Sequence, residues 1–119
     1  MIKGRVNQNR EPIIFIEIAG KKLTAIIDTG FNGDAELPNN LLSHLTASFA
    51  GEVTSILAGG YTAKESMYHV DFPFDGTVHK IEAAFALTET ILIGTRLLKD
   101  YKLEIDFVKK TVLLERQID

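Results

Sequence analysis

Apolar residues recur at every second position over long stretches of the chain, and this period of two restricts the fold more than any other feature. From residue 14 to residue 18, isoleucine alternates with phenylalanine and glutamate, and the alternation resumes over residues 23–27 after the turn Ala19-Gly20-Lys21. Such alternation is typical of a strand with one buried face. Residues 14–27 are therefore predicted to form a β-hairpin that leads into Asp28-Thr29-Gly30.

The same pattern, bounded by glycine, proline and polar turns, predicts further strands. Short strands are predicted at residues 2–6, 35–38, 91–93, 103–107 and 112–114. Two β-rich arms, at 52–58 and 61–72, flank Gly59-Gly60. A further hairpin is predicted at Asp75-Gly76, between residues 70–74 and 78–87. Leucines at helical spacing predict two short helices, one between Pro38 and Leu45 and one from Gly94 to Tyr101. We expect a mostly β single domain over residues 1–119, with one or two short helices and a small closed or orthogonally packed β-barrel-like architecture.

Composition restricts the class of protein. The chain of 119 residues suits one domain, and with 45% hydrophobic residues it can bury a core. A net charge of -3 argues against a nucleic-acid or anionic-membrane partner, either of which calls for a clustered basic surface. Because the chain has no cysteine, disulfides, thiolate metal sites and a cysteine nucleophile are excluded. Residues 1–7 hold no apolar run long enough for a signal peptide or membrane span, so a soluble cytoplasmic protein is expected.

The residues with the clearest chemical signal follow the predicted hairpin. The apolar run Ala25-Ile26-Ile27 ends in Asp28, and a carboxylate at the end of a buried strand is costly unless it is hydrogen-bonded, paired or functional. Gly30 permits a tight turn, and the Thr29 hydroxyl can donate or accept a hydrogen bond within it. Taken alone, this tripeptide is more often an ordinary polar turn, and the later run Ile91-Leu92-Ile93-Gly94 is equally a core strand that ends at glycine.

The order of these segments resembles the retropepsin-like aspartic peptidases of the pepsin clan, in particular the small bacterial and archaeal members. The resemblance spans about residues 12 to 115 and is specific at residues 26–33 and 91–98. It implies that Asp28 is the catalytic carboxylate, that Thr29 locks two active-site loops together across a dimer, and that the Gly30 carbonyl contacts substrate. No metal or organic cofactor is implied, and the three histidines are expected to be solvated surface residues.

The resemblance also assigns supporting segments. Ala58, Gly59, Gly60 and Tyr61 match a flap that closes over bound peptide, although two glycines are equally an ordinary hairpin turn. Ile93 and Gly94 match the motif that packs behind the active-site loop, and Phe31 is expected beside the substrate. The terminal segments 1–6 and 111–118 could interleave with those of a second chain, as in retroviral dimers.

Two positions depart from the retroviral pattern. Phe31-Asn32 follows Gly30 where retroviral enzymes carry Ala-Asp, and a phenylalanine side chain cannot donate a hydrogen bond to the catalytic carboxylate. Thr95-Arg96 follows Gly94 in place of Arg-Asn, so the dimer contacts of this chain must differ.

One catalytic aspartate in each chain implies a homodimer. Peptide hydrolysis of this class needs two carboxylates that share a proton and one water, and the chain offers a single Asp-Thr-Gly. The second carboxylate is therefore expected from Asp28 of an identical chain on a two-fold axis, with a peptide or an unfolded protein segment as substrate. The alternative is a weakly active or inactive dimer of the same fold that serves as a peptide-binding or scaffold module.

Overall fold

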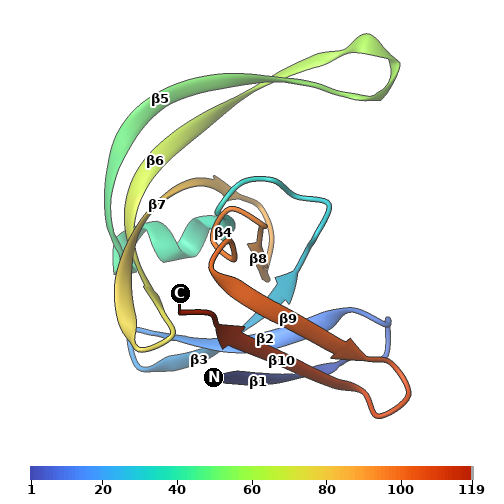
Figure 1. Cartoon of the computed structure of the whole chain (residues 1–119). Coiled ribbons are helices and arrows are strands. Elements are labelled where there is room, and N and C mark those ends of the chain that lie inside the picture. Colours follow the sequence, from blue (N-terminus) through green and yellow to red (C-terminus); the bar gives the residue numbers. More distant parts are fainter. Residues whose placement is uncertain (119) are drawn as a thin grey trace.

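The computed structural model describes residues 1–118, which form one ten-stranded sheet and two short 3-10 helices (Figure 1). The elements in chain order are β1 (Ile2–Val6), β2 (Pro12–Ile18), β3 (Lys21–Ile27), β4 (Ala35–Pro38), η1 (Asn39–His44), β5 (Thr46–Ile56), η2 (Ala58–Gly60), β6 (Thr62–Phe74), β7 (Thr77–Ala86), β8 (Ile91–Ile93), β9 (Tyr101–Asp106) and β10 (Thr111–Arg116). The strand order across the sheet is β5-β6-β7-β4-β8-β3-β2-β1-β10-β9. The prediction of a mostly β chain is confirmed.

The sheet bends sharply but does not close, so the predicted closed or orthogonally packed barrel-like architecture is not confirmed. Its two edges are β5 and β9, and no ladder joins them within residues 1–118. Figure 1 shows the reason: β5 and β6 leave the body together as a long arm, which carries the β5 edge away from β9. The arm spans 11 residues of β5 and 13 of β6, so β5 begins six positions before the predicted start at residue 52.

Two tight turns set the register of the predicted hairpins. Ala19 and Gly20 join β2 to β3 with φ angles of 52° and 77°, and Asp75 and Gly76 join β6 to β7 with φ angles of 53° and 77°. Positive φ at both central residues is the type I′ geometry, whose twist matches that of the flanking strands. Both predicted hairpins are therefore confirmed.

The buried faces follow the predicted alternation. Ile14, Ile16 and Ile18 are buried on one face of β2, whereas Glu17 between them is exposed. The core also takes side chains from seven other strands, from η1 and from the segment before β9; its largest fully buried members are Phe72, Ile14, Leu37, Ile91, Ile93, Leu114 and Val70. Because burial alternates along the strands, one face of the bent sheet encloses the core.

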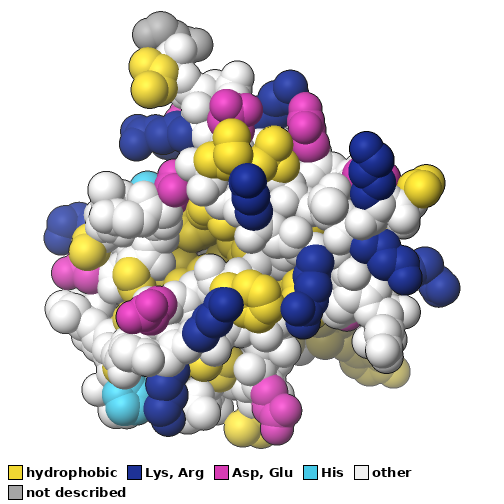
Figure 2. Space-filling model, turned by 90° about the horizontal axis from the view of Figure 1, so that it is seen from below, with side chains coloured by type: hydrophobic (Ala, Val, Ile, Leu, Met, Phe, Trp, Pro, Cys, Tyr) yellow, Lys and Arg dark blue, Asp and Glu magenta, His cyan; other side chains and the backbone are white. Residues whose placement is uncertain are grey.

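The opposite face of β2 carries Phe15 between two cations. The Arg5 guanidinium carbon lies 5.3 Å from the ring centroid and the Lys22 ammonium 4.6 Å from it. Both distances are within the range of cation–π attraction. Figure 2 shows lysine and arginine side chains gathered around apolar ones on the underside of the molecule.

The first predicted helix forms as η1, but the second does not form. Residues 95–100 make consecutive turns, in which the Lys99 amide donates to the Arg96 carbonyl (3.4 Å) and the Tyr101 amide to the Leu98 carbonyl (2.9 Å). These bonds span three residues, which is tighter than an α-helix. Since β9 already begins at Tyr101, the segment is too short for a regular helix, although Leu97 and Leu98 are buried.

The two ends of the chain pair with each other. β1 runs antiparallel to β10, with Ile2 opposite Leu114 and Arg5 opposite Thr111. The terminal strands therefore form a ladder within one chain, so the interleaving of these segments with a second chain is not needed to complete the sheet. No helix within residues 1–118 combines the length and hydropathy needed to cross a membrane.

Candidate active site

The central strands β3 and β8 place Asp28 at the end of the sheet. β3 runs parallel to β8, and β8 lies between β3 and β4. The Asp28 amide donates to the Ile93 carbonyl at 2.9 Å, which extends the β3–β8 pairing by one bond. Asp28 is therefore the first residue to leave a buried parallel pair, and its carboxyl group is only partly buried.

The Asp28 carboxylate is held by its own turn. The Gly30 amide donates to Asp28 Oδ1 at 2.9 Å, and the Phe31 amide donates to the Asp28 carbonyl at 3.1 Å. Among residues 1–118, the Gly30 amide is the one group that hydrogen-bonds this carboxylate. Thr29 and Gly30 are exposed, and the Thr29 hydroxyl has no hydrogen-bond partner in that part of the chain. The turn therefore presents a carboxylate and a hydroxyl at the surface.

The loop after Asp28 is bonded along its length to the segment after β8. Gly94 donates to the Asp34 carbonyl (2.9 Å), Thr95 to the Phe31 carbonyl (2.8 Å) and Arg96 to the Gly33 carbonyl (3.2 Å) through their backbone amides. The Thr95 hydroxyl adds a bond of 3.3 Å to the Phe31 carbonyl. Ile93 and Gly94 are thus hydrogen-bonded through their backbones to the segment from Asp28 to Asp34.

Phe31 fills the space between the loop and Gly94. A Cβ atom on Gly94 would meet the Gly33 carbonyl oxygen and approach Phe31 Cδ2 to 2.8 Å, and one on Gly33 would approach Phe31 Cε1 to 2.7 Å. Only glycine permits this approach. Phe31 therefore supports the loop, in addition to lining the cavity described below.

Asp34 lies in the loop between β3 and β4, next to the candidate site, and was not among the residues predicted from the sequence. It is only 8% exposed, and its Oδ2 accepts a hydrogen bond of 3.0 Å from the Glu82 amide on β7. Arg96 Nε lies 4.0 Å from Asp34 Oδ1, and Arg96 Nη1 lies 3.4 Å from Glu82 Oε2. Arg96 thus pairs within its own chain. The sequence feature that could have indicated a buried Asp34 is its position directly before the apolar strand that begins at Ala35.

The predicted flap residues form the tip of the arm. Gly59 and Gly60 both have φ of 83°, and the turn is closed by a bond of 2.6 Å from the Leu57 amide to the Tyr61 carbonyl. Tyr61 is 74% exposed, and Ala58 starts η2. A hairpin turn at these glycines is confirmed. Within residues 1–118 the tip makes no hydrogen bond to the Asp28 loop.

One cavity joins the arm to the Asp28 loop. It has a volume of about 300 Å³, and its walls include Phe31 and Gly33 from the loop and Ser55, Glu65 and Met67 from the arm. Carboxylates are frequent in the lining, since Asp34, Glu36 and Glu82 also contribute. The underside of the arm and the loop therefore share one space, although Asp28 itself does not line it.

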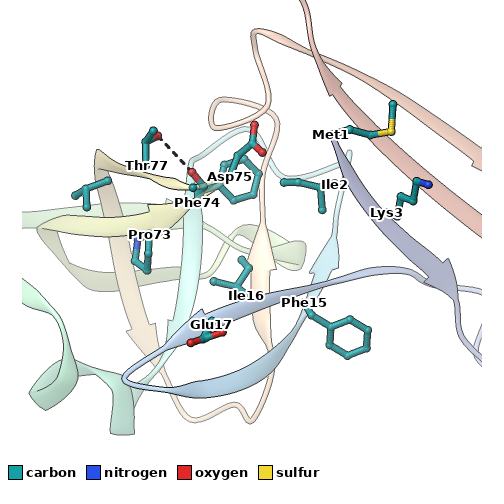
Figure 3. A pocket seen from close by; sticks show the side chains of 12 residues that line it. Met1, Ile2, Lys3, Phe15, Ile16, Glu17, Pro73, Phe74, Asp75 and Thr77 are labelled. Atoms are coloured by element: carbon teal, nitrogen blue, oxygen red, sulfur yellow. Dashed lines mark hydrogen bonds between the residues drawn. The ribbon is translucent and has the colours of Figure 1, made fainter.

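A larger hollow lies elsewhere. It measures about 740 Å³ between β1, β2 and the β6–β7 turn, where Thr77 Oγ1 donates to the Phe74 carbonyl at 3.4 Å (Figure 3). None of the predicted site residues lines this hollow. Nearby, His79 Nε2 lies 3.0 Å from the Phe74 carbonyl oxygen and is half-buried, which differs from the predicted solvated surface histidine.

One titratable group away from Asp28 has a strongly shifted pKa. The Tyr101 hydroxyl donates to Asp75 Oδ2 at 2.6 Å, and burial together with this carboxylate raises the pKa of Tyr101 to about 12. Within residues 1–118, no three His, Asp or Glu side chains are grouped so that they could hold a metal ion.

Solved structures provide the comparison for this arrangement. No protein-family model and no curated protein matches the chain. A crystal structure of a retropepsin-like aspartic protease from Rickettsia conorii is similar with a TM-score of 0.65 and 21% identity, over 95% of this chain and 88% of that chain. The foamy viral protease–reverse transcriptase, in complex with an RNA/DNA hybrid, matches with a TM-score of 0.60 and 20% identity over 79% of this chain but only 13% of that chain. The chain therefore has the fold of the retropepsin-like aspartic proteases.

Proposed function

We propose that this chain is one subunit of a homodimeric aspartic endopeptidase in which Asp28 is the catalytic carboxylate. The observation that carries the proposal is the position of Asp28: it leaves a buried parallel strand pair, is held by the Gly30 amide, and is partly exposed on a loop bonded to residues 93–96. The retropepsin-like fold supports it, because aspartic proteases of this fold share that chemistry.

Two copies of Asp28 would form the catalytic pair. Two carboxylates about 3 Å apart cannot both ionise easily, so their pKa values separate, as is known for aspartic proteases as a class. The ionised carboxylate takes a proton from the attacking water, and the protonated one polarises the scissile carbonyl and then protonates the leaving nitrogen. Thr29, exposed beside Asp28, would bond across the two-fold axis to the partner loop.

The substrate would be an extended peptide between the arm and the Asp28 loop. The cavity of about 300 Å³ that both elements line suits a side chain of such a peptide. Backbone pairing with the arm would hold the peptide, and Ala58, Gly59, Gly60 and Tyr61 at the tip would cover it. The Gly30 carbonyl and the Phe31 ring would border the same peptide.

The test is substitution of Asp28. Asp28→Asn preserves the shape of the side chain and the acceptor for the Gly30 amide but removes the ionisable group, so cleavage of a diverse peptide library should fall by about 10³-fold or more. The products are identified by mass spectrometry between acid and neutral pH. Asp71→Asn on β6 is the matched control and should retain activity, because Asp71 pairs only with exposed Lys80. Full activity in Asp28→Ala would end the proposal.

A second candidate is a dimer that binds peptides without cleaving them. Phe31 favours it, because this side chain follows Gly30, packs against Gly33 and Gly94, and cannot donate a hydrogen bond to the Asp28 carboxylate. The same library distinguishes the two candidates. Peptides that are retained by the protein but are never cleaved in an Asp28-dependent manner would favour the binding module.

A further inference from the structure

Two apolar side chains project from the turn between β9 and β10. Phe107 is 58% exposed and Val108 is 92% exposed, and the turn covers residues 107–110. A single exposed apolar residue is ordinary on a protein surface, whereas apolar residues that lie together form a patch of the kind found where another chain binds.

The turn that carries them is held in one conformation. Asp106 Oδ1 accepts hydrogen bonds from the Val108 amide (3.0 Å) and the Lys109 amide (2.9 Å). Lys110 has a φ of 58°, and its carbonyl accepts a bond of 3.1 Å from the Val6 amide on β1. Phe107 and Val108 are thus presented on a fixed backbone, so little ordering entropy is lost when a partner covers them.

The position of the turn relates it to the candidate active site. Figure 1 shows the β9–β10 turn on the same side of the molecule as the loop after β3 and the tip of the arm, at the right of the view, whereas the β6–β7 turn lies at the left. Exposed apolar side chains occur at the arm tip as well, at Ile56, Leu57 and Tyr61. The side that carries the Asp28 loop is therefore also rich in uncovered apolar groups.

A hollow lies directly beside the turn. It measures about 730 Å³, and Phe107 forms part of its wall together with Gly4, Ile105 and Leu113 from β1, β9 and β10. The wall also carries Lys3 and Lys109 together with Glu104 and Asp106, so it holds both cations and carboxylates. A protruding turn next to such a hollow is self-complementary: a two-fold axis brings the turn of each copy toward the hollow of the other, where groups of opposite charge face each other.

We infer that the turn 107–110 contacts a second copy of this chain, in the same dimer that brings two Asp28 carboxylates together. The inference rests on the proposed function, because a site with one Asp28 in each chain is incomplete without a second copy. Two groups of residues that the retroviral pattern uses to join two chains are already paired within one chain: β1 pairs with β10, and Arg96 pairs with Asp34 and Glu82. The apolar turn remains free for the partner.

The test compares two valines that differ in position. Val108→Asp places a charge in the proposed contact, and Val78→Asp places one at a site that is 67% exposed next to the β6–β7 turn, on the opposite side. The dimer dissociation constant is measured by sedimentation equilibrium. Val108→Asp should raise it by about tenfold or more, as for a central interface residue, and Val78→Asp should leave it within about twofold. An equal effect of both variants, or a wild-type protein that stays monomeric at every concentration, overturns the inference.

A second measurement reports burial directly and needs no activity. The chain has no cysteine, so Val108→Cys and Val78→Cys each introduce one thiol, and both side chains are largely exposed in the single chain. As dimer forms with rising concentration, the thiol at position 108 should react at least about tenfold more slowly with a disulfide reagent, while the thiol at 78 keeps its rate. Equal rates in the dimer overturn the inference. A dimer that depends on Val108 but cleaves nothing leaves this inference intact and defeats the proposed catalysis instead.

Discussion

At the scale of single residues, the Asp28 loop depends on how closely two backbone segments approach. Gly94 lies against the Gly33 carbonyl, and the Phe31 ring lies against both glycines. The resulting amide bonds from residues 94, 95 and 96 hold the loop in place, and the side chains of Thr95 and Arg96 add contacts to Phe31 and Asp34. The glycines matter here because of space, since neither has a positive φ.

Substitution of these glycines should separate backbone contact from side-chain contact. Gly94→Ala drives a Cβ into the Gly33 carbonyl, which cannot move freely, and should lower the free energy of unfolding by about 3 kcal/mol. Gly33→Ala meets only the Phe31 ring, and about 1 kcal/mol is expected. Urea denaturation provides both values.

Double variants that combine each glycine substitution with Phe31→Ala supply the control. Removal of the ring by Phe31→Ala should relieve the cost of Gly33→Ala but not that of Gly94→Ala, because the clash with the Gly33 carbonyl remains. Equal coupling energies in the two pairs would show that the ring, and not the backbone, limits both positions.

At the scale of elements, single side chains connect hairpins that are far apart in sequence. Asp34 at the start of β4 accepts the Glu82 amide of β7, across 48 positions. Tyr101 at the start of β9 donates to Asp75 in the β6–β7 turn, across 26 positions. The arm has no comparable connection: from Gly51 to Ser66 none of its residues is buried. The body is therefore the stable part of the molecule, and the arm is the part that can move over a ligand.

The Tyr101–Asp75 bond should be visible in the pH dependence of stability. Tyr101→Phe removes the bond and should lower the free energy of unfolding by about 1 kcal/mol near neutral pH. The pKa of Tyr101 is raised from 10.0 to about 12, so the folded protein holds this proton more tightly than the unfolded chain. The stabilisation is complete below pH 10 and is lost as the pH rises through 12.

Chemical denaturation at a series of pH values measures this effect. The difference between wild type and Tyr101→Phe should narrow from pH 10 to pH 12. Tyr61→Phe is the control, since Tyr61 is exposed at the arm tip, and it should change stability by less than about 0.5 kcal/mol. A difference that stays constant to the highest pH would mean that the Tyr101 proton is not linked to folding.

At the scale of the whole molecule, one open sheet carries one Asp28. Its edges, β5 and β9, are unpaired within residues 1–118, and the side that bears the Asp28 loop also bears the apolar turn 107–110. Under the proposed function a single chain is half of the site, and two chains must associate before cleavage can occur.

Activity should therefore depend on concentration more steeply than that of a monomeric enzyme. Below the dissociation constant of the dimer, the cleavage rate per chain should fall in proportion to total protein, because only the dimer holds two Asp28 carboxylates. A dilution series over about three orders of magnitude, with each sample equilibrated before substrate is added, measures this. A rate per chain that stays constant across the dissociation range would show that one chain is sufficient.

Local features of this protein were determined by the sequence itself. Alternating isoleucines specify the faces of β2, and Ala19-Gly20 and Asp75-Gly76 specify hairpin turns, because these outcomes depend on residues that are neighbours in the chain. The position of Asp28 directly after an apolar strand could be predicted from the sequence for the same reason.

Only the tertiary structure decided the rest. It placed β8 between β3 and β4, opened the sheet at β5 and β9, paired β1 with β10, and replaced the second helix by turns before β9. It also buried Asp34 and stacked Phe31 on Gly94. Such contacts join distant residues: Asp34 and Glu82 are 48 positions apart, and Ile2 and Leu114 are 112 positions apart. They depend on the path of the whole chain, about which the local pattern of apolar residues carries no information.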